Sequence, residues 1–362
     1  MTRTRAANSG SPIIGGWGDA FAASRDTPFN IMSKKRLLSG MQPTGGGFLH
    51  LGNLEGALKP WVQRQDDFEM FCMIADWHSL TTVAEKRFDI AEASRQTALD
   101  YLAAGLDPNK CAIFRQSAVP EHAELHLLLS MVTPVGWLER VPTYKEKRDL
   151  VKENDTQVSY GLLGYPVLQT ADIIVYRAHA VPVGRDQAAH IEISREIARR
   201  FNHVVGADVF PEPDAVINEF SGELPGMDGR KMSKSYDNAI YLSDTPKQTQ
   251  KKINSAFTTP TKIHLTDPGI PEGCVACKLR RVYDPAHYLT QWDECRAGER
   301  GCGQSKKELT EIINESLAPI RARRAELESN PGYVAEVLRQ GAKTARAAAS
   351  ETMTIVRKAL LL

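Results

Sequence analysis

The chain has 362 residues, of which 42% are apolar and 25% are charged, a composition typical of a globular protein that buries one large core or two smaller ones. Its 45 basic and 44 acidic residues give a formal net charge of +1, which excludes nucleic-acid binding by a uniformly cationic surface, so an RNA partner would have to bind at local patches. No apolar run approaches the ~18 residues of a membrane span, and we therefore expect a cytoplasmic protein with no membrane partner.

The N-terminal segment, residues 1–35, is rich in Gly, Ser, Ala and Arg and poor in acidic residues. This composition predicts a flexible extension. A transit peptide has a similar bias and stays open as an alternative.

Residues 36–242 alternate between two kinds of pattern. Apolar runs of strand length occupy 36–40, 68–75 and 111–117, and helical spacing occupies 53–66 and 91–104. This alternation predicts an α/β fold, in which a Rossmann-type parallel sheet is covered by helices on both faces. Ligands of such sheets gather at the carboxyl ends of the strands.

The strand signal fades after residue 243. Helical patterns dominate at 246–257, 306–327 and 333–360. We therefore predict a second domain, residues 243–362, that is mostly helical.

A glycine-rich turn follows the first predicted strand. The segment Gln42-Pro43-Thr44-Gly45 leads through further glycines to His50-Leu51-Gly52-Asn53. Glycines let the backbone approach phosphate oxygens closely, a helix starting near Asn53 presents free N–H groups, and an imidazole can donate to a phosphate oxygen. The Walker Gly-Lys-Thr pattern is absent from this turn, which argues against a P-loop NTPase.

The pentapeptide Lys231-Met232-Ser233-Lys234-Ser235 is the second signal for ATP chemistry. Two ammonium groups three residues apart on a serine-containing loop suit a pyrophosphate leaving group, because negative charge grows there as an α-phosphate is attacked. A solvated turn would explain the pentapeptide alone, but the pair of motifs in this order points to ATP chemistry.

Four hydrogen-bonding side chains share one predicted helical face. If the chain is helical from Pro166 on, this face carries Tyr165, Gln169, Asp172 and Tyr176. A carboxylate among aromatic and apolar neighbours can accept a hydrogen bond from an indole N–H or from a phenol. A surface or helix-capping aspartate is the alternative for Asp172.

The segment Val181-Pro182-Val183-Gly184-Arg185-Asp186-Gln187 leads into another predicted helix. A glycine before an aspartate at such a strand-to-helix junction can place the carboxylate on ribose hydroxyls. An ordinary helix cap is an equally good explanation of Asp186 taken alone.

Four of the six cysteines, Cys274, Cys277, Cys295 and Cys302, lie within 29 positions. In a cytoplasmic protein such clustering favours a metal over disulfides, and four thiolates suit either a tetrahedral Zn²⁺ or an iron–sulfur cluster. Cys72 and Cys111 lie in apolar runs and are expected to be core residues.

Taken together, these motifs resemble those of class I tryptophanyl-tRNA synthetases, from about Arg36 to the C-terminus. His50-Leu51-Gly52-Asn53 is a version of the "HIGH" signature, the pentapeptide at 231–235 is the intact "KMSKS" signature, and Ala75-Asp76-Trp77-His78 adds to the match. The catalytic residues that the resemblance implies are His50, Asn53, Lys231 and Lys234. The implied ATP-binding residues are Gln42, Pro43, Thr44, Gly52, Asn53, Gly184, Arg185, Asp186, Leu224, Lys231, Met232, Ser233, Lys234 and Ser235. The implied tryptophan-binding residues are His78, Tyr165, Gln169, Asp172 and Gln187, with Asp172 accepting the indole N–H.

The resemblance also implies the reaction and the partners. Tryptophan would attack ATP, with Mg²⁺ on the phosphates, to give tryptophanyl-adenylate, and the acyl group would pass to tRNA(Trp). A homodimer is implied as well, with the C-terminal helices binding the anticodon.

The cysteines depart from the pattern of the family members that carry an iron–sulfur cluster. In those members the set includes a closing Cys-x2-Cys, whereas here Cys302 is followed three residues later by Ser305. Cys277 would have to replace the missing ligand. On the resemblance we favour a [4Fe–4S] cluster over Zn²⁺ at these cysteines.

Three other interpretations stay open. A tyrosyl-tRNA synthetase shares the ATP signatures and the Tyr165 to Asp172 face. A non-catalytic RNA-binding protein descended from a synthetase is disfavoured by the intact Lys231, Lys234 and His50. A small nucleotidyltransferase would not explain the long helical C-terminal part.

Overall fold

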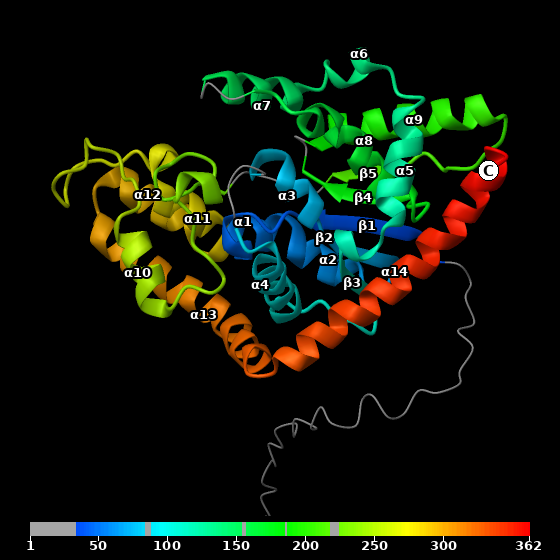
Figure 1. The fold of residues 1–362 in the computed structure, drawn as a ribbon. Helices are drawn as coiled ribbons and strands as arrows, with labels where there is room; N and C mark the ends of the chain where they lie inside the picture. Colours follow the sequence, from blue (N-terminus) through cyan, green and yellow to red (C-terminus); the bar gives the residue numbers. More distant parts are fainter. Residues whose placement is uncertain (1–33, 84–87, 154–156, 185–186, 218–223) are drawn as a thin grey trace, which may run out of the picture. The chain divides into compact units, whose positions relative to one another are not determined.

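The computed structural model describes residues 34–83, 88–153, 157–184, 187–217 and 224–362 (Figure 1). The chain divides into two units, Met1–Lys34 and Lys35–Leu362. Nearly all of the predicted N-terminal extension lies outside the described residues. Within the described ranges, no helix is both long enough and apolar enough to cross a membrane.

Five parallel strands form the central sheet, in the order β3-β2-β1-β4-β5. Their bounds are β1 Arg36–Met41, β2 Glu69–Ile74, β3 Cys111–Arg115, β4 Ala180–Val183 and β5 Asp214–Ile217. The strand order reverses between β1 and β4, which is where ligand crevices form in open parallel sheets. The Rossmann-type sheet predicted from the sequence is confirmed.

Helices cover both faces of the sheet, because successive residues of a strand point to opposite sides. In β1, Leu37 packs into the layer built by the helices after β1 and β2, and Leu38 into the layer of the helices after β3 and β4. The first layer contains α1 Leu51–Asn53, α2 Lys59–Arg64 and α4 Ile90–Ala103. The second contains α5 Glu121–Ser130, α8 Tyr160–Ile174 and α9 Ala188–Val205. The described residues of this part of the chain also contain α3 Asp76–Val83, α6 Val135–Leu138 and α7 Pro142–Glu153.

The helix predicted over 53–66 is interrupted. A π-helical segment, Leu54–Leu58, separates α1 from α2, and the Lys59 N–H bonds to the Leu54 carbonyl. Pro60 has no N–H to donate to the carbonyl of Gly56, so the regular ladder cannot continue through this turn. The spacing predicted helix correctly, but not the change of pitch near the glycine-rich turn.

The C-terminal region is helical, as predicted. Its helices are α10 Pro246–Asn254, α11 Val275–Tyr283, α12 Tyr288–Ala297, α13 Cys302–Glu328 and α14 Pro331–Ala359. In the described part of the chain, no strand follows β5.

The last helix packs against the sheet itself. Helix α14, red in Figure 1, lies against β3, the strand at one edge. At Gly341 the approach is so close that an added Cβ would lie 1.9 Å from the Ile113 carbonyl oxygen. Glycine is therefore required there, and α14 covers a strand edge that would otherwise invite pairing with another chain.

Candidate active site

A cavity of about 470 Å³ opens at the carboxyl ends of the strands, around the point where the strand order reverses. Its wall combines residues that the sequence assigned to two different ligands. Those from the predicted ATP site are Gln42, Asn53 and Gly184. Those from the predicted tryptophan site are His78, Tyr165, Gln169, Asp172 and Gln187. Three residues of the predicted ATP site therefore share one cavity with all five residues of the predicted tryptophan site.

The glycine-rich turn adopts a conformation that only glycine takes readily. Gly45, Gly46 and Gly47 all have positive φ angles, 57°, 73° and 83°. An added Cβ at Gly47 would also lie 1.8 Å from the Ala93 carbonyl oxygen. The glycine run thus sets the path of the chain into His50.

His50 begins α1 as its cap. Its Nδ1 accepts the Asn53 backbone N–H at 3.3 Å, and the Asn53 side chain accepts the His50 N–H at 3.1 Å. Burial, assisted by the charge of Lys234, lowers the pKa of His50 to about 4. The imidazole is therefore neutral near pH 7, and because Nδ1 accepts, its proton is on Nε2. His50 can donate one hydrogen bond to an anionic ligand.

Lys234 reaches the glycine-rich turn from the second motif. Its Nζ donates to the Thr44 carbonyl at 2.9 Å, and its stem packs beside Gly45. Asn238 fixes the loop, because its Oδ1 accepts the Ser233 N–H at 2.8 Å and its Nδ2 donates to the Lys231 carbonyl at 3.1 Å. The two sequence motifs, distant along the chain, meet here.

Leu224 and Met232 anchor the same loop to the protein interior. The Met232 N–H donates to the Leu224 carbonyl at 2.9 Å, and both side chains are buried. Ser233 and Ser235 hydrogen-bond to each other through their hydroxyls, at 2.8 Å. Arg185 and Asp186, both predicted to bind ATP, lie outside the described residues.

The charge of Lys234 makes a pH dependence testable. Burial lowers the pKa of Lys234 to about 8 although Asp100 opposes the shift, so the free protein loses this ammonium as the pH rises through about 8. We expect kcat/KM for ATP to fall through that pH, and kcat to fall only at higher pH because bound phosphates favour the ammonium. Pyrophosphate exchange measured from pH 6 to 10 checks this.

The matched control is Lys234→Arg, whose guanidinium stays charged over this range. The alkaline fall of kcat/KM should then move out of the measured range. A fall that persists near pH 8 in this variant would assign the titration to another group.

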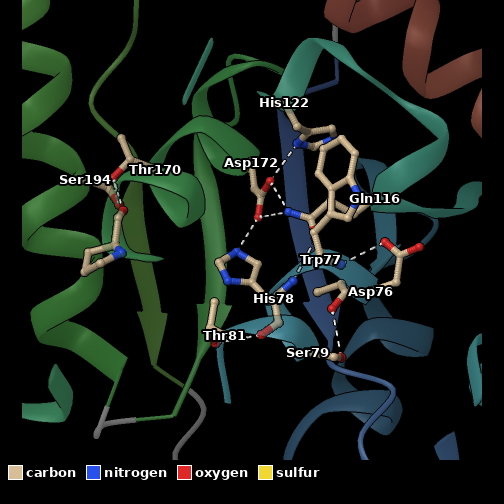
Figure 2. Close-up of polar contacts among 12 residues, drawn as sticks. Asp76, Trp77, His78, Ser79, Thr81, Gln116, His122, Thr170, Asp172 and Ser194 are labelled. Carbon is tan, nitrogen blue, oxygen red and sulfur yellow. Dashed lines mark hydrogen bonds and ion pairs between the residues drawn. The ribbon is translucent and has the colours of Figure 1, made fainter. Parts of the chain in front are cut away.

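Asp172 is the buried centre of a polar network (Figure 2). Its carboxylate contacts His78 Nε2 at 2.8 Å, His122 Nδ1 at 2.7 Å and Gln116 Nε2 at 2.8 and 3.0 Å. Burial alone would raise its pKa, but the charges and hydrogen bonds of His122 and His78 outweigh burial and lower the pKa to about 2. Asp172 is therefore an ionised acceptor at the cavity wall, and the surface alternative is wrong.

The predicted face of α8 is present in part. Tyr165, Gln169 and Asp172 line the cavity together, and the Tyr165 hydroxyl pairs with His190 Nε2 at 2.8 Å. Tyr176 follows the end of the helix and is fully buried behind Asp172 instead. Helix α8 begins at Tyr160, capped by the Ser159 side chain, so that Pro166 is an interior residue.

Sequence reasoning missed Gln116 and His122. Both are fully buried and bind Asp172, although neither is among the residues that the sequence assigned to a site. A usable signal existed for Gln116, because it directly follows β3 and polar residues at that end of a parallel strand face the ligand crevice.

A second missed cluster links the first motif to a C-terminal helix. The Leu49 N–H, one residue before His50, donates to Asp100 Oδ2 at 2.7 Å. Asp100 also accepts a hydrogen bond from Arg324 of α13, whose guanidinium lies over the Phe48 ring, 5.6 Å from its centroid. Asp100 and Arg324 are both buried, so a carboxylate joins the catalytic turn to α13 in the interior.

The four cysteines of the predicted metal site lie near one another. Cys274 hydrogen-bonds to Cys277, and Cys277 to Cys295, while Cys302 acts electrostatically on Cys295. The hydrogen bond from Cys277, which outweighs burial, lowers the pKa of Cys274 to about 6 and so favours a thiolate. In the described ranges, however, no three or more His, Cys, Asp or Glu side chains have the geometry of a metal site. The thiols suit a metal chemically, but they do not form a closed site.

Comparison with known proteins identifies the family. The model of the family "tRNA synthetases class I (W and Y)" matches residues 32–318. A tryptophan–tRNA ligase of Thermotoga maritima is 45% identical, over 90% of this chain and 98% of its own, and one of Aquifex aeolicus is 40% identical, over 90% and 99%. Tryptophanyl-tRNA synthetase from Campylobacter jejuni, solved with ADP and tryptophan, has 37% sequence identity and a TM-score of 0.78, covering 90% of this chain and 100% of that chain. The chain belongs to the class I tryptophanyl-tRNA synthetase family and is a tryptophan–tRNA ligase.

Proposed function

We propose that the cavity binds tryptophan and ATP side by side and forms tryptophanyl-adenylate. The observation that supports this most strongly is the continuous wall that joins Asn53 and Gly184 to Tyr165 and Asp172. The related Campylobacter jejuni enzyme was solved with ADP and tryptophan, the two classes of ligand that this wall suits.

In the proposed first step, the tryptophan carboxylate attacks the α-phosphorus of ATP and pyrophosphate leaves. No enzyme nucleophile is needed, so the protein contributes positioning and charge stabilisation. Lys231 and Lys234 stabilise the growing negative charge on pyrophosphate, and neutral His50 donates from Nε2 to a phosphate oxygen. Mg²⁺ enters on the ATP phosphates as part of the substrate.

Tryptophan is oriented by the other end of the cavity. The buried, ionised Asp172 accepts the indole N–H, and Tyr165, Gln169 and Gln187 bind the remainder of the amino acid. A site with a buried acceptor strongly rejects ligands that lack the donor, since the acceptor would be left without its partner.

The acyl group then passes to the terminal ribose of tRNA(Trp). We propose that residues 36–242 are the catalytic domain and that residues 243–362 bind the anticodon region. Helices α10, α11 and α13 pack together, and their exposed basic side chains provide local patches for RNA in a chain of nearly neutral charge. These side chains are Lys247, Lys251, Lys278, Arg281 and Lys307.

The protein is proposed to act as a homodimer. A second cavity, of about 290 Å³, is lined by Trp77, Leu80, His126 and Tyr160 among others. Leu80 is 40% and Tyr160 70% exposed. Met131, which directly follows the helix that carries His126, is 73% exposed. Exposed apolar side chains favour a protein interface, and a second copy of the chain is the occupant proposed here.

We expect Met131→Asp to convert the dimer into a monomer, because a charge would be buried at the interface. Light scattering coupled to size-exclusion chromatography measures the mass directly. Leu361→Asp, at the 94% exposed end of the chain, is the matched control and should keep the dimer. A wild-type mass of one chain, about 40 kDa, would refute the proposed dimer.

We also propose that Cys274, Cys277, Cys295 and Cys302 hold a metal group, a [4Fe–4S] cluster in preference to Zn²⁺. The clustering of the four cysteines within 29 positions of the sequence, with Cys277 next to both Cys274 and Cys295, supports it. No catalytic step depends on this group. Iron, sulfide and zinc analysis of anaerobically purified protein decides between the two, and a protein free of all three would refute the proposal.

The function is tested by amino-acid-dependent ATP–pyrophosphate exchange, with tryptophan and tyrosine side by side. Exchange with tryptophan alone supports the cavity assignment. Exchange with tyrosine alone would move Asp172 to phenol recognition. A cytoplasmic location stays a prediction from the sequence.

A further inference from the structure

The Asp172 carboxylate is held by side chains from three separate elements. His78 comes from α3, Gln116 from the short helix η3 (Gln116–Ala118) and His122 from α5 (Figure 2). Of these three, only His78 lines the cavity with Asp172, while Gln116 and His122 approach from the buried side. The carboxylate is therefore held by donors on its buried side, and its other side faces the cavity.

The two oxygens of Asp172 differ in their partners. Oδ1 receives Gln116 Nε2 at 2.8 Å and His122 Nδ1 at 2.7 Å. Oδ2 receives His78 Nε2 at 2.8 Å and shares the Gln116 amide at the longer distance of 3.0 Å. The Gln116 amide lies closer to Oδ1, so Oδ1 has its two closest donors on the buried side, whereas the closest partner of Oδ2 is His78, which lines the cavity.

His122 is itself held on its far side. Its Nε2 lies 2.7 Å from the Tyr176 hydroxyl, and the Tyr176 ring stacks on Phe71 with centroids 4.4 Å apart. Since ionised Asp172 can only accept, His122 Nδ1 donates to it, and His122 Nε2 pairs with the Tyr176 hydroxyl on the other side of the ring. The chain of contacts runs from Asp172 into the core.

We propose that Gln116, His122 and Tyr176 form a positioning relay that aims Oδ2 of Asp172 at the ring N–H of the amino acid. This inference rests on the proposed role of Asp172 in tryptophan binding. The relay determines specificity through orientation, because none of its three members lines the cavity. Without the relay, the carboxylate could rotate away from the cavity. The enzyme would then discriminate less strongly between tryptophan and an amino acid that has no ring N–H.

The test compares tryptophan with 3-(benzothiophen-3-yl)alanine, an isostere in which sulfur replaces the ring N–H. The readout is the ratio of the two kcat/KM values in ATP–pyrophosphate exchange. We expect Gln116→Leu and His122→Phe to lower kcat/KM for tryptophan about tenfold while leaving the value for the isostere nearly unchanged. His122→Asn, which can keep a donor to Asp172, should restore part of the ratio.

Tyr176→Phe removes a single oxygen and keeps the core packed, so it tests the relay even if the other variants fold poorly. Its ratio should fall by a smaller factor than that of His122→Phe. Thr170→Val is the matched control, since Thr170 is buried on the same helix and bonds Ser194 Oγ at 3.0 Å rather than Asp172 (Figure 2). Its ratio should equal that of the wild type.

Two results would overturn the inference, and they are distinguishable. If the wild type uses both amino acids equally, the role of Asp172 in indole recognition is wrong and the relay falls with it. If the wild type prefers tryptophan but the variants lose both activities in proportion, or keep the ratio, Asp172 stands and the relay alone is refuted.

Discussion

Replacing Lys234 by alanine is expected to slow adenylate formation roughly 100- to 1,000-fold while leaving tryptophan binding nearly unchanged. A preorganised cation that faces the departing group acts mainly in the transition state, so its loss should appear in kcat. In the structure Lys234 Nζ already lies 2.9 Å from the Thr44 carbonyl, beside the glycine-rich turn. Single-turnover adenylate formation, together with the Kd for tryptophan, measures both effects.

The matched control for this variant is Lys358→Ala, which removes an exposed ammonium near the end of α14. It should activate tryptophan at the wild-type rate. A Lys234→Ala protein with an unchanged activation rate would remove this residue from the proposed role at the leaving group. A large loss of tryptophan affinity would instead show that Lys234 supports the whole cavity.

Replacing Asp172 by alanine is expected to raise the KM for tryptophan roughly 100-fold and to leave the KM for ATP within about twofold, because a charge-assisted hydrogen bond is lost at one end of the cavity only. Pyrophosphate exchange with each substrate varied in turn measures both constants. Asp172→Asn is a second variant for the same test. It keeps the shape of the Asp172 side chain but places an amide among the donors His78, Gln116 and His122.

The alanine variant also removes the buried partner of two histidines, so its thermal midpoint has to be recorded beside the kinetics. A moderate fall in stability is compatible with the proposed role. Equal losses for tryptophan and ATP in a folded protein would contradict the assignment of Asp172 to the amino acid. His78→Ala, at the same carboxylate but on the cavity side, should impair tryptophan use as well.

Local sequence patterns predicted most of the fold. Apolar runs at 36–40, 68–75 and 111–117 became β1 to β3, because a strand buried on both faces needs continuous apolar residues. The two ATP motifs were recognisable for a similar reason, since each works through residues that are close in sequence. The interruption at Leu54–Leu58 escaped prediction because hydrophobic spacing does not report a change of helical pitch.

The parts that the sequence did not predict depend on contacts between distant segments. Gln116 and His122 meet Asp172 only once α5 and α8 pack together. Likewise, nothing local indicates that α14 would lie against β3, except the glycine that permits it. Periodicity shows that a face is buried, but not which element covers it.

The carboxylate of Asp100 has a consequence for how this enzyme can be divided. It binds the Leu49 N–H on one side and Arg324 on the other, so the backbone entering the ATP turn shares a buried anion with a C-terminal helix. Breaking such a pair by removing one partner costs about 3–5 kcal/mol. A fragment cut after residue 242 would leave this anion without its cation and β3 without the helix along its edge. The nucleotide-binding half is thus not a self-sufficient module, and the smallest piece of the chain that can activate an amino acid has to retain both α13 and α14.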